Sequence, residues 1–247
     1  ITTFFTMAYI VVVNPSILST PGTGMSFNGT LTATVLICFL MTLLMGLYAK
    51  LPFAVAPGMG LNAFFTFTII LSHQIWWQVA LGMVFWAGVL FLLISVTPIR
   101  ETIAMAIPKE IRIGTAAGIG VFLTFIALRN AGLITSDPVT FVKLGDVDER
   151  TLLTVVGLVI TVILMIRKNV LAFLAGIFFV TLIAWALGLI KAPAQLFSAP
   201  DFHTVFLKLD ILGALKLSLL PAIVSIAFTD LFDSISTFIG VSHAANL

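Results

Sequence analysis

Two acidic residues, Asp230 and Asp233, lie inside an apolar stretch that runs from 214 to 242. A charged side chain at the centre of a membrane helix costs on the order of 3 kcal/mol, and residues three positions apart share a helix face. Burial and mutual repulsion oppose ionisation of both groups, so at least one carboxyl is expected to carry a proton. The pair is therefore a candidate for proton transfer or ligand binding. The alternative is a structural pair bonded to helix amides or to a base such as Arg129.

A second unusual segment is LPFAVAPGMGLNAFFTFTII, residues 51–70. Its first half is crowded by helix-breaking residues, which are Pro52, Pro57, Gly58 and Gly60. We predict that residues 53–60 are non-helical and that a helix resumes near Asn62. In hydrocarbon, non-helical backbone persists only where protein or a wet cavity covers it. Transporters commonly build binding sites from such broken helices.

Asn62 lies where the predicted helix begins. Its side-chain amide both donates and accepts hydrogen bonds, which suits the mixed edge of a neutral heterocycle. The alternative interpretation is that Asn62 caps the half-helix. Phenylalanines flank both polar segments and could stack on a planar ring, or could serve only for packing; these are Phe64, Phe65, Phe228 and Phe232.

The elements around these residues are apolar and long. Hydrophobic residues make up 60% of the 247-residue chain and charged residues 9%, against roughly a quarter charged in soluble domains. Eight apolar blocks approach the length of about 20 residues that a membrane helix needs. They are residues 1–18, 30–49, 53–72, 75–98, 111–134, 151–166, 169–190 and 214–242. The composition predicts an all-α integral membrane protein.

Charge and ligand-type residues exclude other classes. The net charge is +2 without a basic run, so no nucleic-acid partner is expected. The single Cys38 and the three histidines show no metal-ligand spacing, and no metal or cofactor is expected. Residues 99–110 are mildly amphipathic and could lie along the membrane surface.

Charge placement predicts an orientation. With a cytoplasmic N-terminus, the inner connections hold six basic and two acidic side chains, a net +4, and the outer ones hold six of each. We therefore predict a cytoplasmic N-terminus by the positive-inside rule. The chain begins and ends at apolar blocks, so we expect a piece of a longer polypeptide.

Several segments resemble the nucleobase–cation symporter-2 family, and more narrowly its adenine/guanine/hypoxanthine permease branch. The segments that carry the resemblance are ITTFFTMAYIVVVNPSILS (1–19), VAPGMGLNAFFTFT (55–68), IPKEIRIGTAAGIGVFLTFIALRNAGLI (107–134) and FTDLFDSISTFIGV (228–241). The resemblance covers nearly the whole chain.

The resemblance implies a fold of fourteen segments in two inverted repeats of seven, of which this chain would supply the first eight. It divides the chain into core segments one to four (1–98), gate segments five to seven (99–190), and a loop with core segment eight (191–247). The broken segment at 51–60 matches the family's third segment. The tenth segment, which contributes further acidic residues in the family, would be absent from this chain.

The resemblance also implies a function. It assigns substrate binding to Asn62, Ala63, Phe64, Asp230 and Asp233, and proton coupling to the two aspartates, with Asp233 favoured for substrate. The expected activity is import of purine bases with protons by alternating access across the cell membrane, by a protein that can form a homodimer. Ser236 stands where the family pattern has glycine, which leaves the preference among purines open.

Three alternatives remain at this point. The nearest is a uracil, xanthine or anion transporter of the same fold. An intramembrane enzyme would need a nucleophile–base pair or a metal cluster within the apolar blocks, and the sequence offers only Ser–Asp pairs without histidine. A channel would favour a repeated ring of pore-lining groups, whereas one acidic pair beside one broken helix favours a single site.

Overall fold

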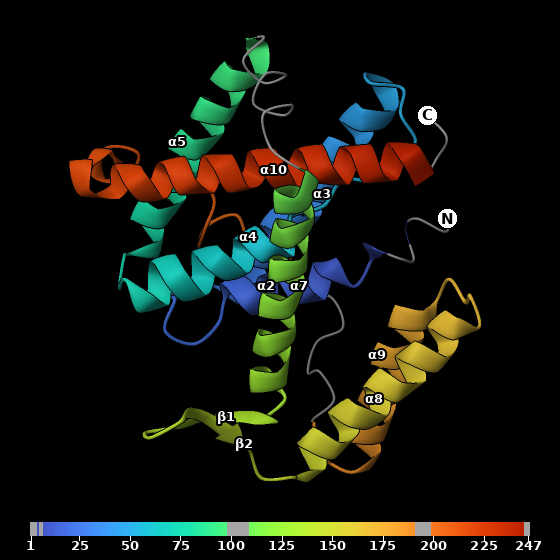
Figure 1. Ribbon diagram of the computed structural model, residues 1–247. Coiled ribbons are helices and arrows are strands. Elements are labelled where there is room, and N and C mark those ends of the chain that lie inside the picture. Colours follow the sequence, from blue (N-terminus) through green and yellow to red (C-terminus); the bar gives the residue numbers. More distant parts are fainter. Residues whose placement is uncertain (1–3, 5–6, 98–108, 191–198, 245–247) are drawn as a thin grey trace. The chain divides into compact units, whose positions relative to one another are not determined.

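The computed structural model describes residue 4 and residues 7–97, 109–190 and 199–244, and it is mostly helical (Figure 1). A helix overlaps each of the eight apolar blocks. In chain order the helices are α2 (Ile10–Leu18), α3 (Phe27–Leu47), α4 (Met59–Ala63), the π-helix η1 (Phe64–Ser72), α5 (Trp77–Val96), α7 (Lys109–Asn130), α8 (Glu149–Ile166), α9 (Ala172–Ala186), the 3₁₀ turns η2 (Gly213–Leu215) and η3 (Leu217–Leu219), and α10 (Leu220–Ala244).

Helix length and hydropathy show a multi-pass membrane protein. Among the described residues, four helical segments are long and apolar enough to cross a bilayer: Phe27–Leu47, Trp77–Val96, Glu149–Ile166 and Leu217–Ile235. The apolar helices Met59–Ser72, Gly120–Asn130 and Ala172–Ala186 are shorter. The assignment of eight membrane segments therefore stays a prediction.

The segment that contains Asn62 changes conformation along its length. Residues 51–58 have no regular secondary structure, and α4 begins at Met59, three residues before Asn62. The prediction of non-helical backbone over 53–60 is therefore wrong at Met59 and Gly60, because glycine disfavours a helix by only about 1 kcal/mol and is tolerated in its first turn. The π-helix η1 follows directly, and its end is marked by a bond from the His73 amide to the carbonyl of Thr68, five residues earlier. Short π-helical stretches are uncommon and frequently occur at functional sites.

A β-hairpin joins α7 to α8, so the expectation of an all-α chain is wrong at this connection. Strands β1 (Ile134–Asp137) and β2 (Phe141–Leu144) pair antiparallel. The Asp137 carboxylate accepts hydrogen bonds from the amides of Val139 and Thr140 and so closes the turn. These bonds hold the pKa of Asp137 below its usual value. A run of β-branched and aromatic residues interrupted by such a turn favours a hairpin.

The described chain divides into two compact units. The first comprises residues 1–13, 34–57 and 122–201, and the second comprises residues 14–33, 58–121 and 202–247. The division into core and gate at 1–98, 99–190 and 191–247 rests on the family resemblance and stays a prediction. The surface stretch predicted at 99–110 falls outside the described residues except for its last two positions, which begin α7.

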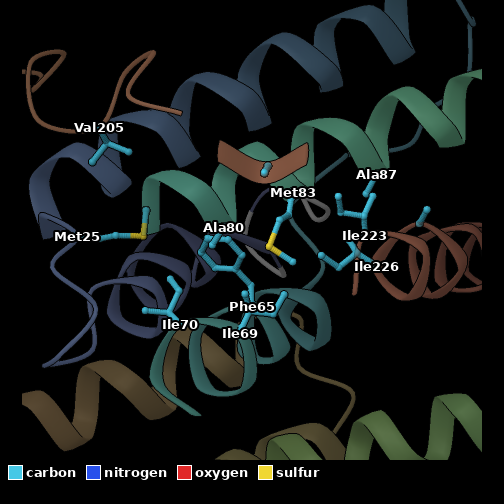
Figure 2. Packing of buried hydrophobic residues seen from close by; sticks show 12 residues of the cluster. Met25, Phe65, Ile69, Ile70, Ala80, Met83, Ala87, Val205, Ile223 and Ile226 are labelled. Carbon is cyan, nitrogen blue, oxygen red and sulfur yellow. The ribbon is translucent and has the colours of Figure 1, made fainter. Parts of the chain in front are cut away.

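The core of the second unit lies between η1, α5 and α10. Figure 2 shows buried side chains from these elements filling one apolar cluster, among them Phe65, Ile69, Met83, Ile223 and Ile226. Gly82 of α5 has no side chain, and the backbone carbonyl of Asp210 fits against it. The loop before η2 is further fixed because the Trp86 indole donates to the Ile211 carbonyl at 2.9 Å. This packing holds α10, with both aspartates, against α5.

In the first unit, α8 and α9 lie side by side (Figure 1). Their contact uses glycines: Gly157 of α8 faces Val180, and Gly176 of α9 faces Thr161. Small residues at such positions let two membrane helices approach closely, so that van der Waals contacts between them increase.

Candidate functional site

Asn62 is paired with a second buried amide. Its Nδ2 donates a hydrogen bond to Oδ1 of Asn14, a residue of α2 that is 48 positions away and only 2% exposed. Both residues belong to the second unit. The capping alternative for Asn62 does not describe this arrangement, because Gly58 is the N-cap residue of α4 and Asn62 lies inside the helix. The Asn62 side-chain amide is instead hydrogen-bonded to Asn14 of α2.

The Asp233 carboxylate lies against the start of α4. A Cβ atom placed on Gly58 would be 3.0 Å from Oδ2 of Asp233, so only glycine leaves the carboxylate its present space. The backbone carbonyl of Gly58 also accepts a hydrogen bond from the backbone N–H of Asn62 at 3.2 Å, so the two residues are one helical turn apart. The start of a helix carries free amide donors and a partial positive charge, which favours an anionic neighbour. The fold thus brings Asp233 of α10 to the turn that contains Asn62.

Asp230 lies one turn before Asp233 on α10 and is partly buried. Neither carboxyl group forms a hydrogen bond or an ion pair with another described residue of the second unit. Their oxygen atoms therefore remain available as acceptors for a ligand, or as sites for a proton. The side chain of Ser236, the position that departs from the family pattern, lies outside the described part of the structure.

The aromatic and small residues near the site differ in exposure. Ala63 is completely buried, and Phe65 is 6% exposed within the apolar core. Phe64 is partly buried and packs against that same core. Phe228 and Phe232 of α10 have ring centroids 6.0 Å apart with planes inclined by 48°. Phe65 is thus a packing residue, and substrate contact by Ala63 and Phe64 stays a prediction.

Sequence reasoning missed three residues of this region. Asn14 precedes Pro15 within an apolar block, and a lone amide in such a block is the signal that could have singled it out. Gly58 was assigned only a helix-breaking role. Thr66, one turn after Asn62, is fully buried, and its hydroxyl has no hydrogen-bond partner among the described residues. A hydroxyl in that condition is uncommon in folded proteins.

The first unit contains an apolar cavity of about 690 Å³. It lies among the start of the chain, α3 and the irregular residues 51–56, and none of the predicted site residues lines it. Thr42 contributes a polar group, but its hydroxyl is used by the backbone of Val55: it accepts from the amide at 3.0 Å and donates to the carbonyl at 3.3 Å. This bond pair satisfies part of the irregular backbone, and the cavity walls offer little to a polar heterocycle.

In the described part of the chain, no three His, Cys, Asp or Glu side chains lie close enough together to hold a metal ion. The structure defines a class: a multi-pass membrane protein in which the Asn14 and Asn62 amides pair and the Asp233 carboxylate lies against Gly58, at the start of the short helix that contains Asn62.

Comparison with known proteins gives the family. A sequence model described as "Permease family", of the xanthine/uracil type, matches residues 1–247. The chain therefore belongs to the nucleobase–cation symporter-2 family, as its motifs predict. The members of this family that it resembles are permeases, which are transporters and not enzymes.

Named relatives match along the whole chain. It is 38% identical over 247 residues to the adenine permease AdeP of Escherichia coli, covering 100% of this chain and 55% of that protein. It is 37% identical over 254 residues to the guanine/hypoxanthine permease PbuO of Bacillus subtilis, covering 100% of this chain and 58% of that protein. A Methanocaldococcus jannaschii protein described as a permease is 47% identical over 247 residues, with 99% and 56% covered. The chain thus spans about half the length of these relatives.

Proposed function

We propose that this chain forms part of a secondary transporter that imports purine nucleobases together with protons. The family and the names of relatives, which include adenine and guanine/hypoxanthine permeases, support a purine base as the substrate class. The transporter works by alternating access, in which one group of helices moves against another around a fixed site. It is a cell-membrane protein with its N-terminus in the cytoplasm, and it can assemble as a homodimer.

The observation that carries the proposal is the meeting of Asp233 with the helix turn that contains Asn62. A purine base presents ring N–H donors and ring nitrogen acceptors along its edges. A carboxylate accepts from the donors, while an asparagine amide does both. Both kinds of group stand within one turn of α4, in a unit whose core is apolar. Such a site suits a small, planar, neutral and polar ligand.

The fold of the whole transporter belongs to this proposal. We assign residues 51–72 to a broken membrane segment, and the chain to the first seven-segment repeat and the start of an inverted second. The contacts of α10 with α5 and α4 support this assignment, because these three helices fall in the predicted eighth, fourth and third segments. The aspartates supply the proton site, since a carboxyl surrounded by apolar protein can bind and release a proton as it is exposed to each side in turn.

The test replaces the carboxyl groups in the natural full-length polypeptide. Asp233→Asn keeps the size and hydrogen-bonding capacity but removes the titratable proton, and it should abolish concentrative uptake of radiolabelled hypoxanthine or adenine. Asp233→Glu should retain some activity, because a carboxyl remains about one methylene displaced. The matched control is Asp146→Asn, an exposed aspartate in the connection between β2 and α8, which should transport normally.

Each outcome is informative when membrane levels of the variants are equal. Unchanged pH-dependent accumulation in Asp233→Asn would remove that residue from the mechanism, and the same result in Asp230→Asn would leave proton coupling by this pair without support. Asn62→Ala should weaken purine binding, because the polar edge of the bound base would lose its hydrogen-bond partner at a cost of roughly 1–3 kcal/mol. Uptake of uracil but not of purines by the unaltered protein would favour a pyrimidine transporter of the same fold.

A further inference from the structure

We propose that Asn14 is a positioning residue that fixes the orientation of the Asn62 amide toward the substrate. This inference rests on the proposed function, because it assigns a role to a second residue of the same site. The hydrogen bond from Nδ2 of Asn62 to Oδ1 of Asn14 carries it.

The bond couples the orientations of two asparagine side chains, Asn62 and Asn14. The terminal torsion of asparagine is broad and roughly two-fold, so its oxygen and nitrogen can exchange places at little cost. In this bond Oδ1 of Asn14 accepts, so the nitrogen of Asn62 faces it. The Asn14 amide has the same two-fold torsion, so the bond ties the orientation of each amide to that of the other. Oδ1 of Asn62 and its second N–H are then left to face a ligand. The orientation of one amide therefore decides whether a purine meets an acceptor or a donor at a given place.

Asn14 is well placed to act as a fixed reference. It lies in α2 and is 2% exposed, and the following Pro15 is completely buried. The Pro15 carbonyl accepts from both the amide and the hydroxyl of Ser19, the latter at 2.7 Å. Packing and hydrogen bonds thus restrain the backbone of the turn that follows Asn14.

The helix that contains Asn62 begins only three residues earlier, at Met59. α4 has only five residues, with irregular backbone before it and a π-helix after it. Short helices depend on tertiary contacts for most of their stability. The bond to Asn14, a residue of the same unit, adds such a contact at Asn62 itself.

The experiment compares Asn14→Leu, Asn14→Asp and Asn28→Leu in the natural full-length polypeptide. Leucine matches asparagine in size but cannot accept a hydrogen bond, whereas aspartate retains an acceptor oxygen at the same place. We expect Asn14→Leu to raise the KM of purine uptake about five- to tenfold, the equivalent of one lost hydrogen bond. Asn14→Asp should lie much closer to the unaltered protein. Asn28, an exposed residue near the start of α3, is the matched control and should show an unchanged KM.

A double variant tests whether Asn14 acts through Asn62. In an Asn62→Ala background, Asn14→Leu should cause no further rise in KM, because the amide that it positions is gone. A further rise of similar size would overturn the inference, as would an unchanged KM in Asn14→Leu alone. If Asn14→Leu does not reach the membrane, Asn14→Ala in the same backgrounds carries the comparison.

A substrate-free measurement separates this inference from the proposed function. Thermal unfolding of the purified single and double variants gives the coupling between Asn14 and Asn62 directly. Favourable coupling supports the bond even if the unaltered protein takes up no purine, a result that would refute the proposed function alone. If purine is taken up but the two residues are uncoupled in both stability and KM, only the positioning role is refuted.

Discussion

Replacing Gly58 by alanine should displace the Asp233 carboxylate without changing Asp233 itself. The new Cβ would lie 3.0 Å from Oδ2 of Asp233, whereas ordinary van der Waals contact begins at 3.4 Å. The carboxylate must therefore retreat by about 0.4 Å, the difference between these two distances. It can do so by a small rotation, because it is the end of a flexible side chain.

The cost to folding should be small. Gly58 has φ −69° and ψ 113°, a backbone conformation that alanine adopts without strain. Exchanging glycine for alanine at such a position stabilises proteins by about 0.4–1 kcal/mol through the unfolded state. Alanine is a poorer N-cap residue than glycine, which offsets part of that gain. We expect a net change in the free energy of unfolding below about 1 kcal/mol.

The effect on transport should be larger. A hydrogen bond from Asp233 to the purine that is lengthened or misdirected loses up to its net value of about 1 kcal/mol, which corresponds to roughly a fivefold rise in KM. The assay is the initial rate of radiolabelled hypoxanthine or adenine uptake against concentration, with the amount in the membrane measured for each variant.

The control is Gly88→Ala on α5, a glycine that has open space around the position of a Cβ atom. This variant should be more stable, since alanine is the better helix former by about 1 kcal/mol, and its uptake should be unchanged. An unchanged KM in Gly58→Ala, beside a clear loss in Asp233→Asn, would show that the contact at Gly58 does not position the carboxylate.

Two further predictions concern stability in the first unit. Gly176→Val should lower the thermal midpoint by overpacking, at a cost of about 1–3 kcal/mol, because the added Cβ would overlap the hydroxyl of Thr161 on α8; Gly46→Val, where the space is open, is the control, and equal midpoints would contradict the assigned packing. Asp148 caps α8 by accepting from the Thr151 amide at 2.7 Å, and this bond holds the pKa of Asp148 below its usual value. Its contribution to stability is therefore present above the ordinary aspartate pKa of about 3.9 and is lost as the pH falls through the lowered folded value. Asp148→Asn should retain the cap but lose this pH dependence, and identical pH profiles in thermal unfolding would refute the cap's role.

The local course of the chain could be predicted from the sequence. Apolar block length located the helices, because a membrane helix satisfies its backbone groups within the segment. Prolines and glycines predicted irregular backbone before Asn62, and residues 51–58 have no regular secondary structure, although the helix begins at Met59. The hairpin at 134–144 was not predicted, because its two four-residue strands depend on a turn closed by one side chain, Asp137.

The partners of the polar residues depended on tertiary structure. The sequence singled out Asp233 because a carboxylate is costly inside a membrane helix, and Asn62 because its amide both donates and accepts hydrogen bonds. It contained no information that Asn62 would pair with Asn14, or that Asp233 would lie against Gly58. These contacts join residues that are far apart in the sequence, and the packing of α10 against α5 and α4 brings Asp233 to its place. Sequence determined which side chains need a partner or a ligand, while folding determined which of them meet, because that depends on helix packing and not on local propensity.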